Sequence, residues 1–280
     1  MTTTATSRSA HNGFELPAIG FGTVDLRGVD GTTAIASAID AGYRLIDSAF
    51  NYENEGVVGR ALEQSGVDRS ELLVTSKLPG RHHEAPLNRQ SIEESRARLG
   101  VDAIDLHLIH WPNPRCDQYV EAWRAMIDAR ERGVVRQIGV SNFLPEHLER
   151  IESETGVRPV VNQIEIHPYF PQEDVLELHR ERGILVEAWS PLGQGGEVLT
   201  EPVITNIAEG HGCTPAQVVL AWHLARGVIP IPRSSSPEHQ RSNLAAADIT
   251  LYGAEVEAIT ALGRSTGRMF DGDPAVHEEF

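Results

Sequence analysis

The sequence predicts an α/β protein in which eight parallel strands alternate with helices and close into a (β/α)8 TIM barrel, with an N-terminal β-hairpin across the barrel floor. One repeated pattern supports this prediction. A polar, Arg- or Glu-rich segment ends at a glycine, a short apolar run follows, and a polar residue closes the run. Glycine caps a helix in the left-handed conformation, and a continuous Val/Ile/Leu run suits a strand buried on both faces. The length of 280 residues is sufficient for eight such units.

Copies of this pattern follow one another along the chain, five of them clearly and two, at 66–77 and 156–163, more loosely. The stretches between the apolar runs carry helical spacing, for example at Val57, Val58 and Ala61. Alternation of helix and strand is typical of a parallel sheet covered by helices. With the first run included, the expected strands are 19–23, 43–46, the end of 66–77, 104–109, 134–140, the end of 156–163, 184–189 and 228–232.

The hairpin is predicted by Asn12-Gly13, which lies between two short stretches and favours a tight turn. An open, doubly wound sheet is the alternative architecture, and it normally carries a GxGxxG turn after its first strand. Gly20-x-Gly22 has Asp25 where that motif requires its third glycine, so the fingerprint is absent. Because no linker or composition shift divides the chain, we expect residues 1–280 to form a single domain.

Composition narrows the function classes. The net charge of −16 repels phosphate backbones, so nucleic acid is not an expected partner. No apolar run approaches the roughly 18 residues of a membrane span, and Met1 to Ala10 lacks the apolar core of a signal peptide. Cys116 and Cys213 lie far apart without metal-type spacing, which favours a reduced, cytoplasmic protein. A closed barrel leaves no sheet edge to pair, so we expect a monomer.

Lys77 is the single lysine among 24 basic residues. Arginine replaces lysine easily on a surface, but not where a compact, titratable ammonium is needed, because guanidinium is planar and stays protonated. Lys77 closes the third expected strand, and active sites of such barrels lie at the carboxyl ends of the strands. The residues that close the runs are polar and chemically varied: Asp47, Lys77, His110, Ser141, Gln163, Ser190 and Arg233.

Tyr52 lies five residues past Asp47, in the loop after the second expected strand. The pKa of a free phenol is about 10, and the ammonium of Lys77 would stabilise the phenolate and lower that pKa. Asp47 could hold Lys77 charged, and His110 could hydrogen-bond a substrate oxygen. Such a cluster suits protonation of a carbonyl oxygen as hydride reaches the carbon, and hydride requires a nicotinamide cofactor. Each member also has an ordinary structural explanation, as a turn cap, a rim aromatic or a core histidine.

Six segments carry further motifs: 42–55 (GYRLIDSAFNYENE), 74–78 (VTSKL), 104–112 (IDLHLIHWP), 138–143 (IGVSNF), 161–169 (VNQIEIHPY) and 190–193 (SPLG). In content and in order they resemble the aldo-keto reductase family, in particular its bacterial carbonyl reductase and diketogluconate reductase-like members. The resemblance covers 19–243 and is highly specific because the motifs occur together. It implies NADPH-dependent reduction of aldehydes, ketones or dicarbonyls. The implied catalytic residues are Tyr52 as general acid, assisted by Lys77, Asp47 and His110.

The resemblance also implies contacts to the cofactor. The nicotinamide would stack on Trp189, where the family usually has tyrosine, and an indole offers at least as large a face. Other residues implied along the nicotinamide and pyrophosphate are Gly22, Thr23, Ser141, Asn142, Gln163, Ser190 and Leu192.

The segment 231–239 resembles the motif of the family at the adenosine end of the cofactor. Arg233 replaces the usual lysine and can still bind a 2′-phosphate in a bidentate manner. His239 stands where the family has an arginine, and Ser242 where it has a glutamate. These departures predict a preference for NADPH with weaker discrimination against NADH. The cofactor residues implied at this end are Arg233, Ser234, His239 and Asn243.

The substrate pocket is expected to include Trp111 and Phe50. Val24 stands where larger aromatics are common in the family, which predicts a more open mouth. The C-terminal segment, 263–280, is expected to lie over that mouth and to influence specificity. A disordered acidic tail is the alternative interpretation of this segment.

Two other functions stay open. A Schiff-base aldolase would use Lys77 as nucleophile without a cofactor, which leaves Asn142 and Gln163 without a role. A non-catalytic nicotinamide-binding partner subunit would keep the cofactor contacts, although the complete set of four catalytic residues argues against it. A metal-dependent hydrolase is less favoured, because His107 and His110 are three apart on a strand and point to opposite faces. We therefore expect no metal site.

Overall fold

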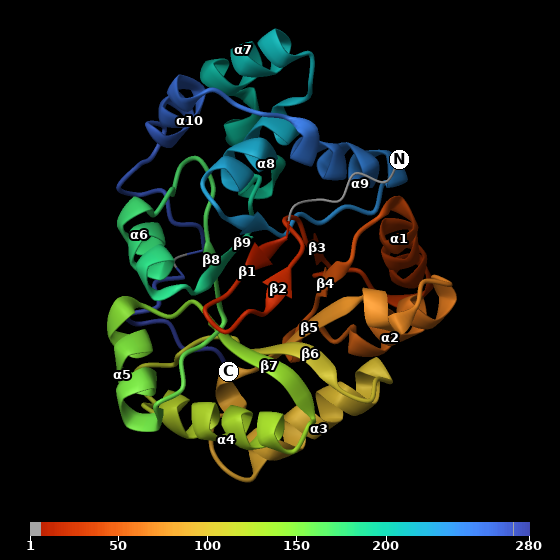
Figure 1. Cartoon of the computed structure of the whole chain (residues 1–280), viewed down its shortest axis with the longest axis vertical. Coiled ribbons are helices and arrows are strands. Elements are labelled where there is room, and N and C mark those ends of the chain that lie inside the picture. Colours follow the sequence, from red (N-terminus) through yellow and green to blue (C-terminus); the bar gives the residue numbers. More distant parts are fainter. Residues whose placement is uncertain (1–6, 271) are drawn as a thin grey trace.

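Eight parallel strands form a barrel in the computed structural model, which describes residues 7–270 and 272–280 (Figure 1). In the sheet the strands follow one another in chain order. Because they are parallel, their carboxyl ends lie at the same end of the barrel, and the predicted fold class is confirmed. The strands are β3 (Phe21–Gly22), β4 (Leu45–Asp47), β5 (Leu73–Leu78), β6 (Ile104–Ile109), β7 (Val135–Ser141), β8 (Val161–Glu165), β9 (Leu185–Trp189) and β10 (Ile229–Pro230).

The barrel closes where β3 meets β10. The N–H of Gly20 donates to the carbonyl of Pro230, and the N–H of Gly22 donates to the carbonyl of Pro232, each at 3.0 Å. The close approach requires glycine at position 20, because a Cβ there would lie 2.4 Å from Cδ1 of Ile231. Both strands are shorter than predicted. In β10 the reason is that Pro230 and Pro232 have no N–H to give to a ladder.

Helices surround the barrel (Figure 1). Left-handed glycines end α1, α3, α5 and α6, as the repeated pattern predicts. Apolar side chains fill the barrel interior and the layer between strands and helices. The helices are α1 (Gly28–Ala41), α2 (Glu55–Gln64), α3 (Leu87–Leu99), α4 (Tyr119–Glu131), α5 (Pro145–Thr155), α6 (Glu173–Arg182), α7 (Pro202–His211), α8 (Pro215–Ala225), α9 (Pro237–Leu244) and α10 (Gly253–Thr260).

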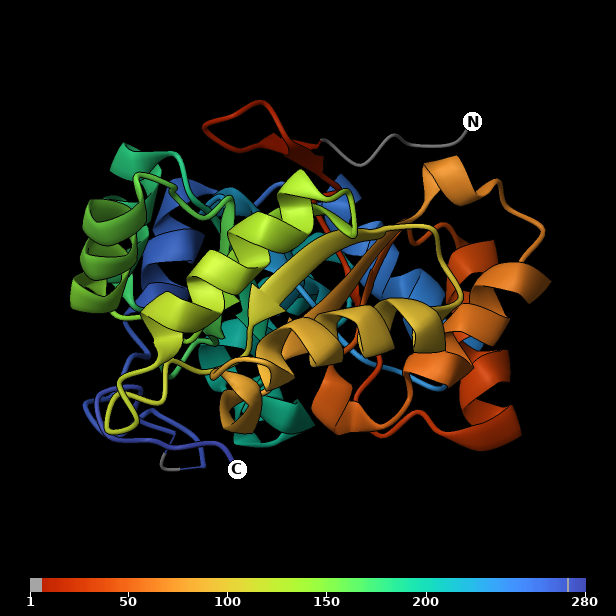
Figure 2. The same ribbon diagram turned by 90° about the horizontal axis from the view of Figure 1, so that it is seen from below.

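The predicted hairpin consists of β1 (Arg8–Ser9) and β2 (Glu15–Leu16), which pair antiparallel across a turn at Asn12-Gly13. The N–H of His11 donates to the carbonyl of Gly183 at 2.8 Å, which ties the hairpin to the loop before β9. Leu16 is completely buried and belongs to the apolar cluster of the barrel interior. The hairpin and the C-terminal segment lie at opposite ends of the molecule (Figure 2). The hairpin thus covers the floor of the barrel, and the other end is left for the site.

The sequence predicts that Met1 to Ala10 is not a signal peptide. Residues 1–6 of that segment lie outside the described residues. Within the described part of the chain, no helix combines the length and apolar character needed to cross a bilayer. The cytoplasmic location and the monomeric state stay predictions.

Candidate active site

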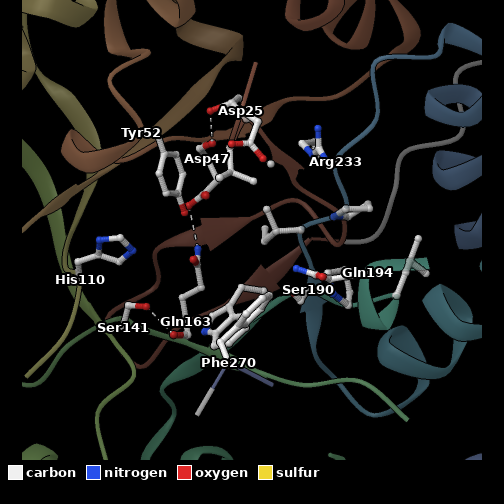
Figure 3. Close-up of a pocket in the computed structure, with 18 of the residues that line it drawn as sticks. Asp25, Asp47, Tyr52, His110, Ser141, Gln163, Ser190, Gln194, Arg233 and Phe270 are labelled. Carbon is white, nitrogen blue, oxygen red and sulfur yellow. Dashed lines mark hydrogen bonds between the residues drawn. The ribbon is translucent and has the colours of Figure 1, made fainter. Parts of the chain in front are cut away.

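A cavity of about 840 Å³ opens at the carboxyl end of the barrel strands. Six of the seven polar residues that close the predicted strands line it, and the seventh, Lys77, is buried against Asp47 and Tyr52. Figure 3 shows Tyr52 and His110 on one side of the cavity and Arg233 across from them. Residues far apart in the sequence therefore meet in one concave site, as the barrel topology predicts.

Lys77, in β5, is held by oxygen atoms on several sides. Its Nζ donates to Oδ1 and Oδ2 of Asp47 at 2.8 and 2.7 Å, and to the carbonyl of Ser48 at 2.9 Å. The hydroxyl of Tyr52 lies 3.3 Å from the same nitrogen. Tyr52 is the last residue of a short 3₁₀ turn, η1 (Phe50–Tyr52), which follows β4. This turn brings the phenol beside the strand-end carboxylate and the ammonium.

The surroundings of Tyr52 and Lys77 keep the phenol and the ammonium protonated. Burial raises the pKa of Tyr52 above its ordinary value, and the charge of Lys77 opposes that rise without reversing it. The predicted lowering effect of Lys77 on the phenol pKa is therefore present, but burial, which the sequence does not reveal, outweighs it. Burial also disfavours the charge on Lys77, but Asp47 and Tyr52 raise the pKa of the ammonium above its usual value. The group consequently holds a neutral phenol beside a charged lysine.

His110 follows β6 and faces the cavity next to Tyr52. The two rings pack edge to face with centroids 5.9 Å apart. The backbone N–H of His110 donates to the carbonyl of Leu78 at 2.9 Å, which continues the β5–β6 pairing by one residue. Its Nδ1 lies 2.7 Å from Oε1 of Glu279, a residue to which the sequence assigned no role.

Ser141, Asn142 and Gln163 form a hydrogen-bonded group beside the four predicted catalytic residues. Oγ of Ser141 donates to the carbonyl of Gln163 at 2.7 Å, and Nδ2 of Asn142 donates to Oγ of Ser141 at 3.1 Å. Nε2 of Gln163 donates to Oδ1 of Asp47 at 2.8 Å, which links the two groups. Nε1 of Trp189 donates to Oδ1 of Asn142 at 2.8 Å and fixes the indole at the cavity wall.

Two residues of the cavity wall have left-handed backbone. Asn142 follows β7 with φ of 61°, and Ser190 follows β9 with φ of 47°. This conformation is uncommon outside glycine and tends to occur at binding sites, where the surrounding structure enforces it. At both positions it turns the chain sharply at the strand end, so that the residue lines the cavity.

Glu187, in β9, is a completely buried carboxyl group that sequence reasoning missed. Nε2 of Gln163 donates to its Oε2 at 2.7 Å. Burial, with the nearby charge of Asp47, raises the pKa of Glu187 to about 7. The signal was present in the sequence, since Glu187 is the one charged residue inside the run 184–189, which was interpreted as apolar throughout.

The predicted cofactor residues fall into two groups. The first group lines the cavity and comprises Gly22, Thr23, Ser141, Asn142, Gln163, Trp189, Ser190, Leu192 and Arg233. Ser234, His239 and Asn243 lie outside the lining. Oγ of Ser234 accepts from the N–H of Ser236, which caps α9, while His239 is exposed on that helix and Asn243 is buried at its end.

Two of the three predicted substrate residues lie at the cavity. Val24 and Trp111 line the cavity, whereas Phe50 does not. Phe50 begins the η1 turn that Tyr52 ends, and the tight winding of a 3₁₀ turn points side chains two residues apart in different directions. Its ring instead packs edge-on against His82 and lies beneath the guanidinium of Arg98.

The C-terminal segment, 263–280, contacts the loops at the carboxyl end of the barrel. Its Phe270 lines the cavity, with its ring centroid 6.5 Å from that of Trp189. Its His277 packs on Trp111 with centroids 4.2 Å apart. The sequence assigned no role to Phe270, Asp25 or Gln194, all of which line the cavity, because no periodic or motif signal marks them.

The cavity fits a nicotinamide dinucleotide. Its volume is within the range of cofactor sites, and its wall combines one aromatic face with a few fixed polar groups. Tyr52 lies on the same side of the cavity as His110. The exposed guanidinium of Arg233 lies across the cavity, where it can bind a phosphate. Fold and site together define a barrel oxidoreductase with a nicotinamide cofactor.

Comparison with known proteins agrees with this class. Residues 18–264 match the Aldo/keto reductase family. The chain is 52% identical over 260 residues to 2,5-diketo-D-gluconic acid reductase B of Corynebacterium sp., with 93% of each chain covered. It is 41% identical over 264 residues to methylglyoxal reductase DkgA of Escherichia coli, with 94% of each covered. The crystal structure of a Gox0644 mutant in complex with NADPH matches with a TM-score of 0.93 at 41% identity, covering 98% of this chain and 99% of that chain.

The chain belongs to the aldo/keto reductase family. It is an NAD(P)H-dependent oxidoreductase.

Proposed function

We propose that this enzyme reduces aldehydes, ketones and 1,2-dicarbonyls to alcohols with NADPH, and that Tyr52 is the proton donor. The observation that carries the proposal is the position of Lys77. Its Nζ lies 3.3 Å from the Tyr52 hydroxyl and bonds both carboxylate oxygens of Asp47, directly beside the cavity. This is the arrangement that a phenol needs in order to give up a proton and leave a stabilised phenolate.

Reduction of the carbonyl requires a hydride at carbon and a proton at oxygen. When bound, NADPH would supply the hydride for the carbonyl carbon. Tyr52, which burial keeps neutral, gives its proton to the carbonyl oxygen. The ammonium of Lys77 stabilises the phenolate, while Asp47 keeps Lys77 charged. His110, at the edge of Tyr52, directs the carbonyl oxygen toward the phenol.

The residues proposed to hold the nicotinamide are those of the hydrogen-bonded group next to Asp47. Trp189 offers its face to the ring, and Ser141, Asn142 and Gln163 offer polar atoms to the carboxamide. Gly22, Thr23, Ser190 and Leu192 line the same cavity, as does Arg233, and are proposed to contact the rest of the cofactor.

The proposed preference for NADPH rests on Arg233. Its guanidinium is exposed and can bind a 2′-phosphate through two parallel hydrogen bonds. His239 and Ser242 offer no second fixed cation at this end, so discrimination against NADH is expected to be modest. The NADPH complex of the Gox0644 mutant supports the same cofactor class.

The structure gives little support to a Schiff-base aldolase. A nucleophilic amine must be neutral and must reach the substrate. Nζ of Lys77 is completely buried, has four oxygen neighbours within 3.3 Å, and its pKa is raised. A non-catalytic nicotinamide-binding subunit is the second candidate, and only turnover separates it from the reductase.

The test is the carbonyl-dependent loss of reduced-nicotinamide absorbance with a panel of aldehydes, ketones and dicarbonyls, using NADPH and NADH in parallel. Tyr52→Phe keeps the ring and removes the proton, so we expect it to bind NADPH normally and to lose about 10²- to 10⁴-fold in turnover. Wild-type protein that binds NADPH tightly but turns over no carbonyl would overturn the proposal in favour of the partner subunit.

A further inference from the structure

Glu279, in the C-terminal segment, packs directly against the proposed substrate-orienting histidine. Its Oε1 lies 2.7 Å from Nδ1 of His110, and only 12% of its side chain is exposed. Nothing in the sequence motifs marks this residue, and the proposed function does not use it.

The carboxylate of Glu279 occupies a site built by several loops. Nδ2 of Asn51, in η1, donates to Oε1 at 2.6 Å, and the N–H of Gly80, after β5, donates to Oε2 at 2.8 Å. Asn113, after β6, bonds the backbone of Glu279 in both directions, at 3.0 and 2.9 Å. The loops after β4 and β5 therefore bond the carboxylate, and the loop after β6 holds the backbone of the same residue.

This carboxylate does not fill the cavity. His110 is part of the cavity lining and Glu279 is not, so the contact lies on the side of the ring that faces away from the substrate. Burial alone would raise the pKa of Glu279, but the charge and hydrogen bond of His110, with the donors Gly80 and Asn51, lower it to about 2. The group is therefore ionised at neutral pH. Glu279 therefore does not block the substrate site.

We infer that Glu279 is a positioning residue for carbonyl reduction, whose carboxylate holds the His110 ring by Nδ1 and leaves Nε2 to meet the carbonyl oxygen. The inference rests on the proposed function of His110. Oε1 of Glu279 lies 2.7 Å from Nδ1, and this contact, with the bonds that fix the carboxylate, sets the orientation of the ring. Glu279 is anionic, so it also places a negative charge directly behind the ring.

The other charged groups near the ring are engaged elsewhere. Lys77 and Asp47 bind each other, and Tyr52, which packs edge-on against His110, is neutral. Glu278 points elsewhere, since its Oε1 accepts from the N–H of Arg115 at 2.6 Å. Glu279 is thus the anion that faces His110 from the C-terminal segment.

The experiment compares Glu279→Gln with Glu278→Gln in the full chain. Glu279→Gln keeps size and packing and removes the charge, while Glu278→Gln removes a neighbouring charge without touching His110. The measurements are kcat and KM for methylglyoxal, NADPH affinity, and the ring-nitrogen NMR signals of ¹⁵N-labelled histidine, assigned with His110→Ala. Glu279→Asp, which keeps the charge on a shorter side chain, tests rescue.

We expect Glu279→Gln to lower kcat on the order of tenfold, less than loss of the proton donor itself, with NADPH affinity unchanged. The ring-nitrogen signals of His110 should differ between the wild type and this variant, and Glu279→Asp should recover part of kcat. The Glu278→Gln variant should match the wild type. If Glu279→Gln keeps wild-type kcat, or leaves the His110 signals unchanged, the inference is wrong. A wild type without any turnover would instead overturn the proposed function, and the NMR comparison would still test the Glu279–His110 contact.

Discussion

Nζ of Lys77 lies 2.7 Å from Oδ2 of Asp47, and the two side chains are 0% and 5% exposed. A buried ion pair of this kind contributes little net stability, but loss of one partner leaves an uncompensated charge that costs several kcal/mol, about 3–5 in measured cases. Together with the contact to Tyr52, it accounts for the single lysine in a chain that otherwise uses arginine. The space around Nζ holds four oxygen atoms and leaves no room for a planar guanidinium.

Lys77→Arg is therefore expected to lose most carbonyl reduction, about 10²-fold or more in kcat, because the guanidinium cannot lie beside the phenol as a compact donor. Initial rates and a titration with NADPH check this, and the folded state is followed by thermal unfolding. Lys77→Met, which keeps the length and removes the charge, should be at least as inactive. Near-full activity in Lys77→Arg would show that the role given to Lys77 is wrong.

Arg233→Ala is expected to weaken NADPH and to leave NADH almost unaffected. A charged hydrogen-bonded contact is worth about 1.5–3 kcal/mol, which corresponds to roughly 10- to 100-fold in KM for NADPH. Initial rates with both cofactors measure the ratio, and Arg124→Ala, an exposed position on α4, is the control. Equal losses for both cofactors would mean that Arg233 does not contact the 2′-phosphate.

Leu16→Ala is expected to destabilise the protein by about 2–5 kcal/mol, because Leu16 is completely buried in the apolar cluster under the barrel. Urea unfolding measures the change, and Val29→Ala, at a side chain that is 78% exposed, is the control. A loss as small as that of Val29→Ala would mean that the hairpin does not seal the barrel floor.

The parts of the site that lie at strand ends were predictable from the sequence. The repeat of glycine and apolar run places Asp47, Lys77 and His110 at neighbouring strand ends, and parallel strands bring those ends together. Loop geometry was not predictable in the same way. Phe50 and Tyr52 are two residues apart, yet the η1 turn sends only Tyr52 to the cavity.

The remaining site residues escaped prediction for physical reasons. Phe270 and Glu279 belong to a segment without periodicity, and tertiary contacts alone bring them to the cavity and to His110. The pKa of Tyr52 depends on the balance between burial and the charge of Lys77, and a sequence indicates the charge but not the depth of burial. Glu187 was visible as an acid inside an apolar run, but its neighbours were not.

Glu187 makes stability depend on pH with a definite sign. Its pKa is about 7 in the folded protein and 4.5 ordinarily, so the folded state binds the extra proton between these values. The contribution of Glu187 to the free energy of unfolding is fully present below about pH 4.5 and is lost as the pH rises to about 7. The difference is up to about 3 kcal/mol. Glu187→Gln resembles the protonated carboxyl and removes this dependence. We expect its Tm to match the wild type near about pH 5 and to exceed it near about pH 8.5, whereas Glu209→Gln, at an exposed position of α7, should track the wild type at both. A variant that is less stable than the wild type at both pH values would show that Glu187 is charged and paired in the folded protein.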